Sequence, residues 1–150
     1  MYDIQKILNE LNILPKWDTQ ICLQGIEGND DPFLGCGRKI ENSIFKGKDF
    51  TSFLFDIPYT NSIISNLGLY RTRVLRLSPG RCYSYHRDPT KRIHIPLITN
   101  KQSFLIIDKE VIHLPADGNH YLVDTRQKHT ALNASPPYLK KERIHIEIIY

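Results

Sequence analysis

Cysteine is scarce in this chain and does not occur at the spacing of metal ligands. The sequence has three cysteines in 150 residues, Cys22, Cys36 and Cys82. An odd number without close pairs argues against a disulfide-stapled fold and a cysteine-ligated metal site, and it indicates reduced thiols that serve as small buried hydrophobic residues. We therefore expect a fold held together by a hydrophobic core, in a reducing compartment.

Long hydrophobic runs are also missing. No stretch approaches the roughly 18 uninterrupted apolar residues of a membrane-spanning segment. The start, MYDIQKILNE, shows neither a basic segment followed by an apolar run nor a small-residue cleavage pattern. These features predict a cytoplasmic protein without a membrane partner.

Basic residues outnumber acidic ones, but they form no continuous run. The formal net charge is +4 and the isoelectric point is about 9.0, yet only short pairs such as Lys140-Lys141 occur. No basic run interleaves with aromatic residues, as it would on a surface that binds single strands. We expect an ordinary solvated surface, with no nucleic acid as a partner.

The length suits one domain, residues 1–150, and the first part of it predicts a helix. A chain of this size buries a little under roughly 70% of its unfolded surface, so nothing forces an oligomer and we expect a monomer. Apolar residues recur at helical spacing over 4–14, with Asp3 as the N-cap and Pro15 as the terminator.

Loops and a second helix are predicted before the sequence pattern changes. Glycine and proline crowd residues 25–48, which favours loops over a long regular element. A short helix is predicted over 60–67, capped by Thr60 or Asn61 and ended by Gly68. Residues 1–68 are thus expected to be helices and loops that pack on a sheet.

After Leu69 the pattern is that of short β-strands separated by turn residues. Residues 69–150 are expected to be the β core. Six or seven strands spaced roughly 8 to 12 residues apart are typical of an antiparallel sandwich or jelly roll. No helical pattern separates them, which disfavours a parallel α/β fold. The predicted strands are TRVLRL, RCYSY, RIHIPLI, SFLII, VIHL, HYLVD and RIHIEII.

Two histidines and one carboxylate form a candidate metal site. His86-Arg87-Asp88 follows a predicted strand, and His129 begins another short extended segment. Side chains two residues apart in an extended backbone leave the same face, so His86 and Asp88 can reach one ion together. Non-haem iron(II) oxygenases use two imidazoles and one carboxylate on one face of an octahedron. A surface His-Asp pair is the competing interpretation of the tripeptide.

Charged and apolar residues alternate on two of the predicted strands. In RIHIPL the side chains of Arg92 and His94 point one way and those of Ile93 and Ile95 the other, and RIHIEI repeats the pattern from Arg143. Such a charged face usually meets water. In a barrel whose mouth holds a metal, it can instead line the cavity and meet a doubly negative co-substrate.

Residues 74–149 resemble the aspartyl/asparaginyl β-hydroxylase-like branch of the iron(II)- and 2-oxoglutarate-dependent oxygenases. The resemblance lies in the order and approximate spacing of several motifs. These are RLSPG, the YHRD that contains His86, the R-x-H of RIHIPL, a glycine-containing turn followed by HYLVDTRQKH with His129, the asparagine of TALNAS and the closing R-I-H of RIHIEII.

The resemblance implies a double-stranded β-helix (jelly roll, cupin-like), Fe(II) as cofactor, and 2-oxoglutarate and O2 as co-substrates. It implies hydroxylation of an Asp- or Asn-type side chain, in a peptide or protein or as a free amino acid, with release of succinate and CO2. His86 and His129 become catalytic iron ligands, and Arg143 binds the distal carboxylate of 2-oxoglutarate, with support from Arg92 and His94.

The sequence also departs from the animal members of that branch. A glycine stands two residues after the first histidine in those enzymes, whereas Asp88 here restores the full triad of the wider superfamily. The segment between His86 and His94 is shorter, and the one that leads to Arg143 is longer and contains Pro136-Pro137. The first 70 residues show no match, so the identity of the substrate does not carry over.

Other polar and aromatic residues have ordinary structural interpretations. His113, His120 and His145 are expected to be surface or hydrogen-bonded core histidines. Tyr83 and Tyr85 share one face of an extended strand, so one of them could approach a cavity. Two polar residues after His129, Asn133 and Ser135, are expected to satisfy backbone groups.

Two other functions fit parts of the pattern. A cupin-like barrel could bind a small acid or a peptide without redox chemistry, and it would share the fold. A hydrolytic zinc site also suits two histidines and one aspartate, but it leaves Arg92 and Arg143 unexplained.

Overall fold

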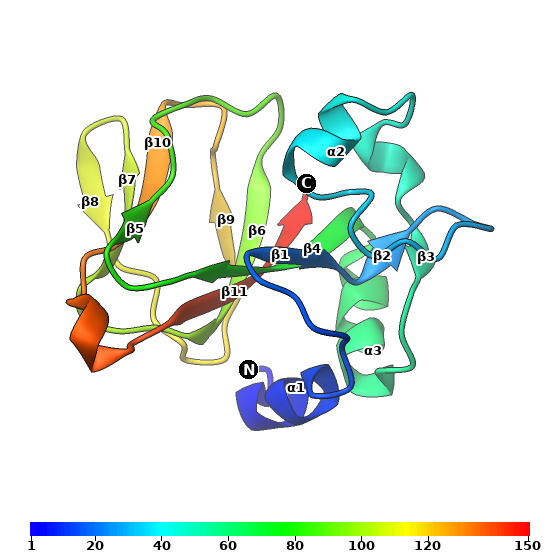
Figure 1. Ribbon diagram of the computed structural model, residues 1–150, viewed down its shortest axis with the longest axis horizontal. Coiled ribbons are helices and arrows are strands. Elements are labelled where there is room, and N and C mark those ends of the chain that lie inside the picture. Colours follow the sequence, from blue (N-terminus) through cyan, green and yellow to red (C-terminus); the bar gives the residue numbers. More distant parts are fainter.

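Two antiparallel sheets form the core of the protein, beside a small two-stranded sheet of β2 (Gln24–Gly25) and β3 (Ser52–Phe53). The computed structural model describes residues 1–150, apart from the side chain of Arg38. One sheet has five strands in the order β1-β4-β11-β6-β9, and the other has four in the order β5-β10-β7-β8 (Figure 1). The strands of the first sheet are β1 (Gln20–Cys22), β4 (Tyr70–Leu77), β11 (Arg143–Ile149), β6 (Arg92–Ile98) and β9 (Tyr121–Val123). Those of the second are β5 (Arg81–Cys82), β10 (His129–Asn133), β7 (Ser103–Ile107) and β8 (Glu110–Ile112).

The chain passes back and forth between the two sheets. From β4 it crosses to β5, returns to β6, crosses to the β7–β8 hairpin, returns to β9, crosses to β10 and ends on β11. This is the double-stranded β-helix, or jelly roll, of the cupins. The expected fold class, mainly β with N-terminal helices, is confirmed.

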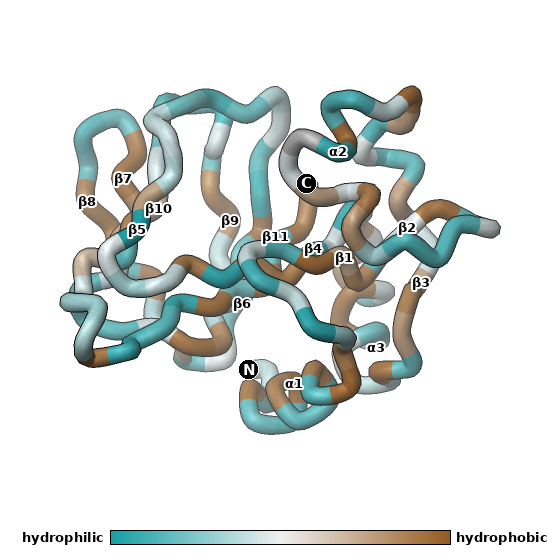
Figure 2. The backbone as a smooth tube through the Cα atoms, in the orientation of Figure 1, coloured by the Kyte–Doolittle hydropathy of each residue, from teal (hydrophilic) through white to brown (hydrophobic). Residues whose placement is uncertain are grey.

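The alternating strands divide the interior into two parts. The isoleucines of β6 and β11, such as Ile95 and Ile146, lie in the main hydrophobic core beneath the helices. Figure 2 shows hydrophobic positions on the helices and on the strands beside them. Each fully buried isoleucine contributes roughly 1.5–3 kcal/mol. The charged residues of the same strands face the second sheet, so a polar cavity opens there.

The first helix, α1 (Ile4–Leu11), is capped as expected but ends early. Asp3 Oδ1 accepts a hydrogen bond of 3.0 Å from the Lys6 backbone N–H. The predicted end was residue 14, but the amides of Ile13 and Leu14 bond three residues back, in tightened turns ahead of Pro15. The amphipathic pattern therefore extends beyond the α-helix itself.

The second predicted helix, α3 (Pro58–Leu67), begins two residues earlier than expected. Proline at its first position needs no hydrogen-bond acceptor for its nitrogen, and Gly68 ends the helix at φ 63°, as predicted. Neither Thr60 nor Asn61 is the cap. Glu10 of α1 takes that role, because its carboxylate accepts hydrogen bonds of 2.8 Å from the amides of Tyr59 and Thr60 and from the Thr60 hydroxyl.

We expect Glu10→Ala to lower the free energy of unfolding by about 1–2 kcal/mol, because a helix cap and the link between α1 and α3 are lost together. Burial alone would raise the pKa of Glu10, but the hydrogen bonds from Thr60 and Tyr59 lower it below its ordinary value. The contribution is therefore present at neutral pH and disappears on acidification. Urea unfolding checks this, with the exposed Glu27→Ala as control. Equal losses in both variants would contradict the capping role.

Short elements that the sequence pattern missed complete the fold. These are β2 (Gln24–Gly25), α2 (Gly37–Glu41), the 3-10 turn η1 (Gly47–Asp49), β3 (Ser52–Phe53) and the 3-10 turn η2 (Pro137–Leu139). The strand β1 was missed too, and it extends the larger sheet by pairing Ile21 with Val74. Elements of two to five residues are too short to show a periodicity.

The cysteines are free thiols, as expected, but only Cys22 is fully buried. Cys36 is partly buried, with its Sγ 3.5 Å from that of Cys22, and Cys82 is exposed. The description as small buried hydrophobic residues holds for Cys22 alone.

None of the helices that the structure describes is long and apolar enough to span a membrane.

Candidate metal centre and co-substrate cavity

A β-bulge brings His86 into place. Cys82 pairs with Leu132, but His86 pairs with His129, so the β5 side has one extra residue in between. The predicted strand RCYSY is regular only over β5. Because of the bulge, Tyr83 lines the cavity while Tyr85 turns outward, 47% exposed. The expectation that the two tyrosines share a face was wrong, because it assumed regular alternation.

His86 and His129 lie directly opposite each other in a hydrogen-bonded antiparallel pair. The amide of His86 donates to the carbonyl of His129 over 3.0 Å, and the reverse bond is 2.8 Å. Side chains of opposed residues stand on the same face, and the two ring centroids lie 4.5 Å apart. A backbone contact between segments 43 residues apart in sequence thus brings the two imidazoles together.

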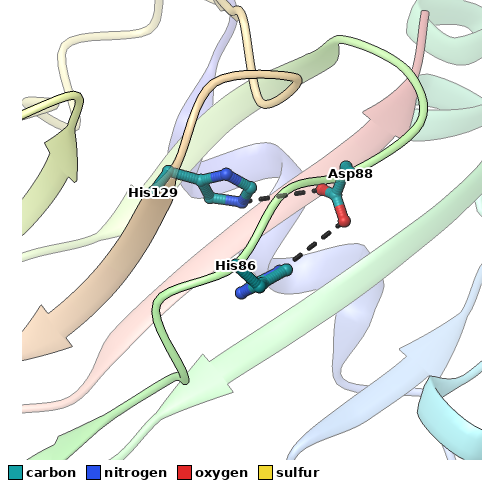
Figure 3. Close-up of side chains that lie close together, drawn as sticks. All are labelled: His86, Asp88 and His129. Atoms are coloured by element: carbon teal, nitrogen blue, oxygen red, sulfur yellow. Dashed lines mark ion pairs between the residues drawn. The ribbon is translucent and has the colours of Figure 1, made fainter.

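Asp88 completes a three-donor cluster with the two histidines (Figure 3). His86 Nε2 lies 3.6 Å from Asp88 Oδ1, and His129 Nε2 lies 3.6 Å from Asp88 Oδ2. One donor atom of each residue lies within 4.8 Å of the other two. Ligands about 2.1 Å from one ion and at right angles stand about 3 Å apart. A small inward movement therefore lets the cluster hold a metal.

The backbone fixes which imidazole nitrogen faces the metal position. His86 Nδ1 lies 2.7 Å from the carbonyl oxygen of Ser84, and His129 Nδ1 lies 2.9 Å from that of Gln127. A carbonyl oxygen only accepts hydrogen bonds, so in each ring Nδ1 carries the proton and Nε2 keeps its lone pair. Metal-binding histidines are oriented in the same way.

A short network holds the segment that carries Asp88. Its amide donates to the carbonyl of Thr125 over 2.9 Å, and the Thr125 hydroxyl donates to the carbonyl of Thr90 over 2.6 Å. Arg92 donates to the Thr90 hydroxyl and also lies 3.4 Å from Asp88 Oδ2. The carboxylate is therefore held toward the two imidazoles.

A cavity of about 640 Å³ opens next to the cluster. All six residues predicted as site residues line it, so the charged strand faces do point inward. These are His86, Asp88, Arg92, His94, His129 and Arg143. The alternation on β6 and β11, which alone was compatible with a solvated surface, therefore marks a cavity wall.

Arg143 is buried in the cavity wall without a counter-ion among the residues described in full. Arg143 is 4% exposed, and its guanidinium forms no ion pair or hydrogen bond with any residue that the structure describes in full. Burial lowers its pKa, and nearby Tyr83 and Glu147 oppose the shift, but the group stays charged at working pH. The Tyr83 hydroxyl, which also lines the cavity, is buried and unpartnered. Together they present a cation and a hydroxyl that an anion could satisfy.

Sequence reasoning missed six charged residues of the cavity, namely Glu41, Lys46, Lys48, Arg71, Arg73 and Glu147. Glu147 is the centre of an ion-pair cluster: it pairs with Arg73, and its Oε1 lies 3.5 Å from Arg92 Nε. Burial alone would raise the pKa of Glu147, but Arg73 and Arg92 lower it to about 2. Arg71 also lines the cavity. The sequence did contain an indication of this. Glu147 lies an even number of residues after Arg143 and so faces the same side of the strand, and the arginines of YRTR alternate in the same way.

His145 was given the wrong interpretation. It is 1% exposed and lines the cavity, and neither ring nitrogen has a hydrogen-bond partner among the residues described in full. It is therefore neither a surface residue nor a hydrogen-bonded core residue. The expectations for the other two histidines are confirmed, since His120 is exposed beside the Tyr2 hydroxyl and His113 bonds the Ser103 carbonyl.

Asn133 and Ser135 have the structural role that was expected. The Asn133 amide donates to the carbonyls of Leu77 and Lys141, and its Oδ1 accepts from the Ser135 hydroxyl over 2.6 Å. They join β4, β10 and the start of β11, and neither lines the cavity.

His94 is a buried, neutral histidine. Burial lowers its pKa from 6.5 to about 4, although Glu147 opposes the shift. The Nε2 atom of His94 lies 3.9 Å from Glu147 Oε2, and neither ring nitrogen has a hydrogen-bond partner among the residues described in full. A neutral imidazole can donate one hydrogen bond to a bound ligand.

The metal-free protein should lose stability as the pH falls from 6.5 to 4. Between these pH values His94 is protonated in the unfolded chain but neutral in the folded protein. The free energy of unfolding therefore rises with pH across this range. The contribution of His94 is on the order of 3 kcal/mol. Urea unfolding at several pH values should give a flatter dependence for His94→Gln than for the wild type. Parallel curves would contradict a neutral His94, and the exposed His120→Gln serves as control.

A comparison with protein families identifies the chain. The model of a family described as aspartyl/asparaginyl beta-hydroxylase matches residues 42–148. The chain belongs to this family. The match begins well before residue 74, where the resemblance had been placed, and it includes η1, β3 and α3. The expectation that the first 70 residues have no match was therefore wrong for 42–70. The match there was overlooked because that part carries no distinctive motif.

Several solved structures are similar to this family member. A predicted oxalate decarboxylase from Thermotoga maritima has 13% identity and a TM-score of 0.43, with coverage of 59% of this chain and 71% of that chain. A cupin domain from Bordetella pertussis has 21% identity and a TM-score of 0.43, with coverage of 53% and 80%. The plu4264 protein from Photorhabdus luminescens has 13% identity and a TM-score of 0.43, with coverage of 53% and 60%. No curated protein matches the chain.

Proposed function

We propose that the protein is a non-haem Fe(II)- and 2-oxoglutarate-dependent dioxygenase that hydroxylates an amino-acid side chain of the Asp or Asn type, free or within a peptide. The observation that supports this best is the pairing of two features in one cavity. His86, Asp88 and His129 converge with both Nε2 lone pairs free, and the buried guanidinium of Arg143 has no counter-ion among the residues described in full.

The three converging donors suit ferrous iron. Two neutral imidazoles and one carboxylate on one side of an ion are the ligand set of this oxygenase class. When bound, the iron and 2-oxoglutarate supply the oxidant that inserts one oxygen atom of O2 into a C–H bond, with release of succinate and CO2. Asp88 also offsets part of the positive charge of the ion.

Arg143 would bind the distal carboxylate of 2-oxoglutarate. Its planar guanidinium matches a carboxylate with two parallel hydrogen bonds, and the unpartnered Tyr83 hydroxyl could add a third. Arg92 is held near Asp88, and neutral His94 can donate a hydrogen bond without adding charge. Both would support the co-substrate beside the metal position.

Apolar residues between these polar groups would limit the entry of water. Leu75, Leu105 and Ala131 line the same cavity. Exclusion of water strengthens the interaction of Arg143 with a carboxylate, and it protects a reactive centre from side reactions.

The alternative is a cupin-like protein that binds a small acid without catalysis. It would use Arg143 in the same way, but it would have no need for three converging metal donors. The two functions differ in metal dependence, because only the oxygenase requires iron for turnover. A hydrolytic zinc site remains less favoured, since it gives no role to the buried arginines.

Turnover of 2-oxoglutarate tests the proposal. The iron-loaded protein is incubated with 2-oxoglutarate, oxygen and a panel of amino acids and peptides, and succinate, CO2 and the gain of one oxygen atom are measured. We expect iron-dependent succinate formation that His129→Ala abolishes. If the protein binds 2-oxoglutarate but shows no iron-dependent turnover with any substrate of the panel, the non-catalytic alternative is favoured.

A further inference from the structure

The cavity carries more positive than negative charge. Six cationic and three anionic side chains line it among the residues described in full. The cations are Lys46, Lys48, Arg71, Arg73, Arg92 and Arg143, and the anions are Glu41, Asp88 and Glu147. A ferrous ion and doubly negative 2-oxoglutarate cancel each other, so the excess remains after both have bound. Another anionic group would be stabilised there.

Arg71 is a partly buried cation of the cavity whose hydrogen-bonding capacity is largely unused. Its Nε donates to the carbonyl of Gly35 over 2.9 Å, but its two Nη atoms make no hydrogen bond or ion pair with any residue described in full. By contrast, Arg73 is committed to Gln20 and Glu147. Burial and the neighbouring arginines lower the pKa of Arg71 to about 10, so it stays charged at neutral pH.

A second bulge holds Arg71 in an unusual backbone conformation. Glu147 pairs with Arg73 but Ile149 pairs with Tyr70, so β4 has one extra residue against β11. Arg71 has φ 52°, which costs a non-glycine residue roughly 1–2 kcal/mol. Its amide is fixed by a 2.8 Å hydrogen bond to the carbonyl of Phe50. Strain of this kind, held by the surrounding structure, is common at ligand sites.

The η1 turn brings further cations close to Arg71. A Cβ on Gly47 would lie 3.0 Å from Ile149 Cδ1 and 3.7 Å from Arg71 Cδ, so the turn packs closely against both residues. Lys46 and Lys48 flank it and line the cavity. Their ammonium groups form no ion pair with the residues described in full. Figure 1 shows α2, which precedes this turn in the chain, beside the end of β11.

We propose that Arg71, with Lys46 at the rim, forms a subsite for a carboxylate group of the substrate, separate from the co-substrate anchor at Arg143. Arg143 and Glu147 are four residues apart on β11, about 13 Å along an extended strand, and Arg71 lies at the Glu147 end. A planar guanidinium with two free Nη atoms suits a carboxylate. The assignment rests on the proposed function, because it names the substrate chemistry of that site.

The carboxylate could be the α-carboxylate of a free amino acid or the side chain of an acidic residue in a peptide. Three probes distinguish these sources. N-acetyl-L-asparagine has only an α-carboxylate, N-acetyl-L-aspartic acid α-amide has only a side-chain carboxylate, and N-acetyl-L-asparagine amide has neither. Each is titrated calorimetrically, without oxygen, into the protein loaded with iron and 2-oxoglutarate, and also into the metal-free protein.

We expect at least one carboxylate probe to bind, and its Kd to rise about ten- to a hundredfold in Arg71→Gln. The neutral probe should bind the wild type no better than the carboxylate probe binds the variant. Lys46→Gln, an exposed position that should not affect folding, should raise the Kd up to about fivefold. The distant Lys101→Gln should leave it unchanged.

Equal Kd values for all three probes, no binding of either carboxylate probe, or an unchanged Kd in both Arg71→Gln and Lys46→Gln would overturn the subsite. The affinity for 2-oxoglutarate, measured in the same preparations, separates this failure from that of the proposed function. Arg71→Gln should retain it, whereas a wild-type protein that binds no 2-oxoglutarate would refute the oxygenase while the metal-free titration still tests Arg71.

Discussion

Replacement of Arg143 by glutamine should lower the affinity for 2-oxoglutarate by at least about thirtyfold. Removal of one partner from a buried, hydrogen-bonded charge pair costs roughly 2–5 kcal/mol, and about 1.4 kcal/mol corresponds to a factor of ten. The loss should be at the high end, because Arg143 is buried and a distal carboxylate left there without it would be shielded from water. Arg143→Lys keeps the charge but not the planar fork and should be intermediate.

The measurement is the Kd of 2-oxoglutarate by titration calorimetry, together with its KM in turnover. Arg81→Gln is the matched control, because Arg81 is an exposed arginine on β5 that does not line the cavity. The affinity of metal-free Arg143→Gln for iron should equal that of the wild type. An unchanged Kd in Arg143→Gln would show that the anion site lies elsewhere.

Asp88→Ala should reduce the affinity for Fe(II) by more than about a hundredfold. Loss of a group that only orients a metal ligand already costs about 10- to 100-fold, and Asp88 would bind the metal directly. The fold should survive, because the Asp88 side chain is partly exposed and pairs only loosely with Arg92 at 3.4 Å. We therefore expect the free energy of unfolding of the metal-free variant to differ from that of the wild type by about 1 kcal/mol or less.

Iron bound per chain under anaerobic conditions checks this prediction. Asp124→Ala is the control, because it removes a carboxylate that pairs with Arg126 on the surface and is absent from the metal cluster. If Asp88→Ala bound iron like the wild type, the two histidines would suffice, as in the animal enzymes that have glycine at this position.

The metal donors were predictable because two of them are local. The spacing of His86 and Asp88 in an extended segment determines that they share a face, whatever the rest of the fold. The approach of His129 is different, since it depends on a backbone pair between distant segments. Only the resemblance to a known family could supply it from the sequence.

Alternation predicted the direction of the charged residues on β6 and β11, but bulges limited its use elsewhere. Tyr85 turns outward because of one extra residue before His86, and the bulge at Arg71 is equally hidden in the sequence. The spacing of polar and apolar residues cannot reveal where a strand gains a residue. The expectation that Tyr83 and Tyr85 share a face failed for this reason.

The outer wall of the cavity was beyond sequence reasoning. Residues 37–48 contain two glycines, Gly37 and Gly47, and form only short elements, and Gly47 packs closely against Ile149 and Arg71. Loops and short turns of this kind are positioned by tertiary contacts and not by local propensity. The residues that the substrate meets are therefore the least predictable part of the site.

A crystal structure of the protein grown without oxygen, with Fe(II) and 2-oxoglutarate, tests the central claim most directly. Anomalous scattering should locate one iron ion ligated by Nε2 of His86, Nε2 of His129 and a carboxylate oxygen of Asp88. Density for 2-oxoglutarate should place its distal carboxylate on the guanidinium of Arg143. Iron bound elsewhere, or a co-substrate that avoids Arg143, would contradict the account.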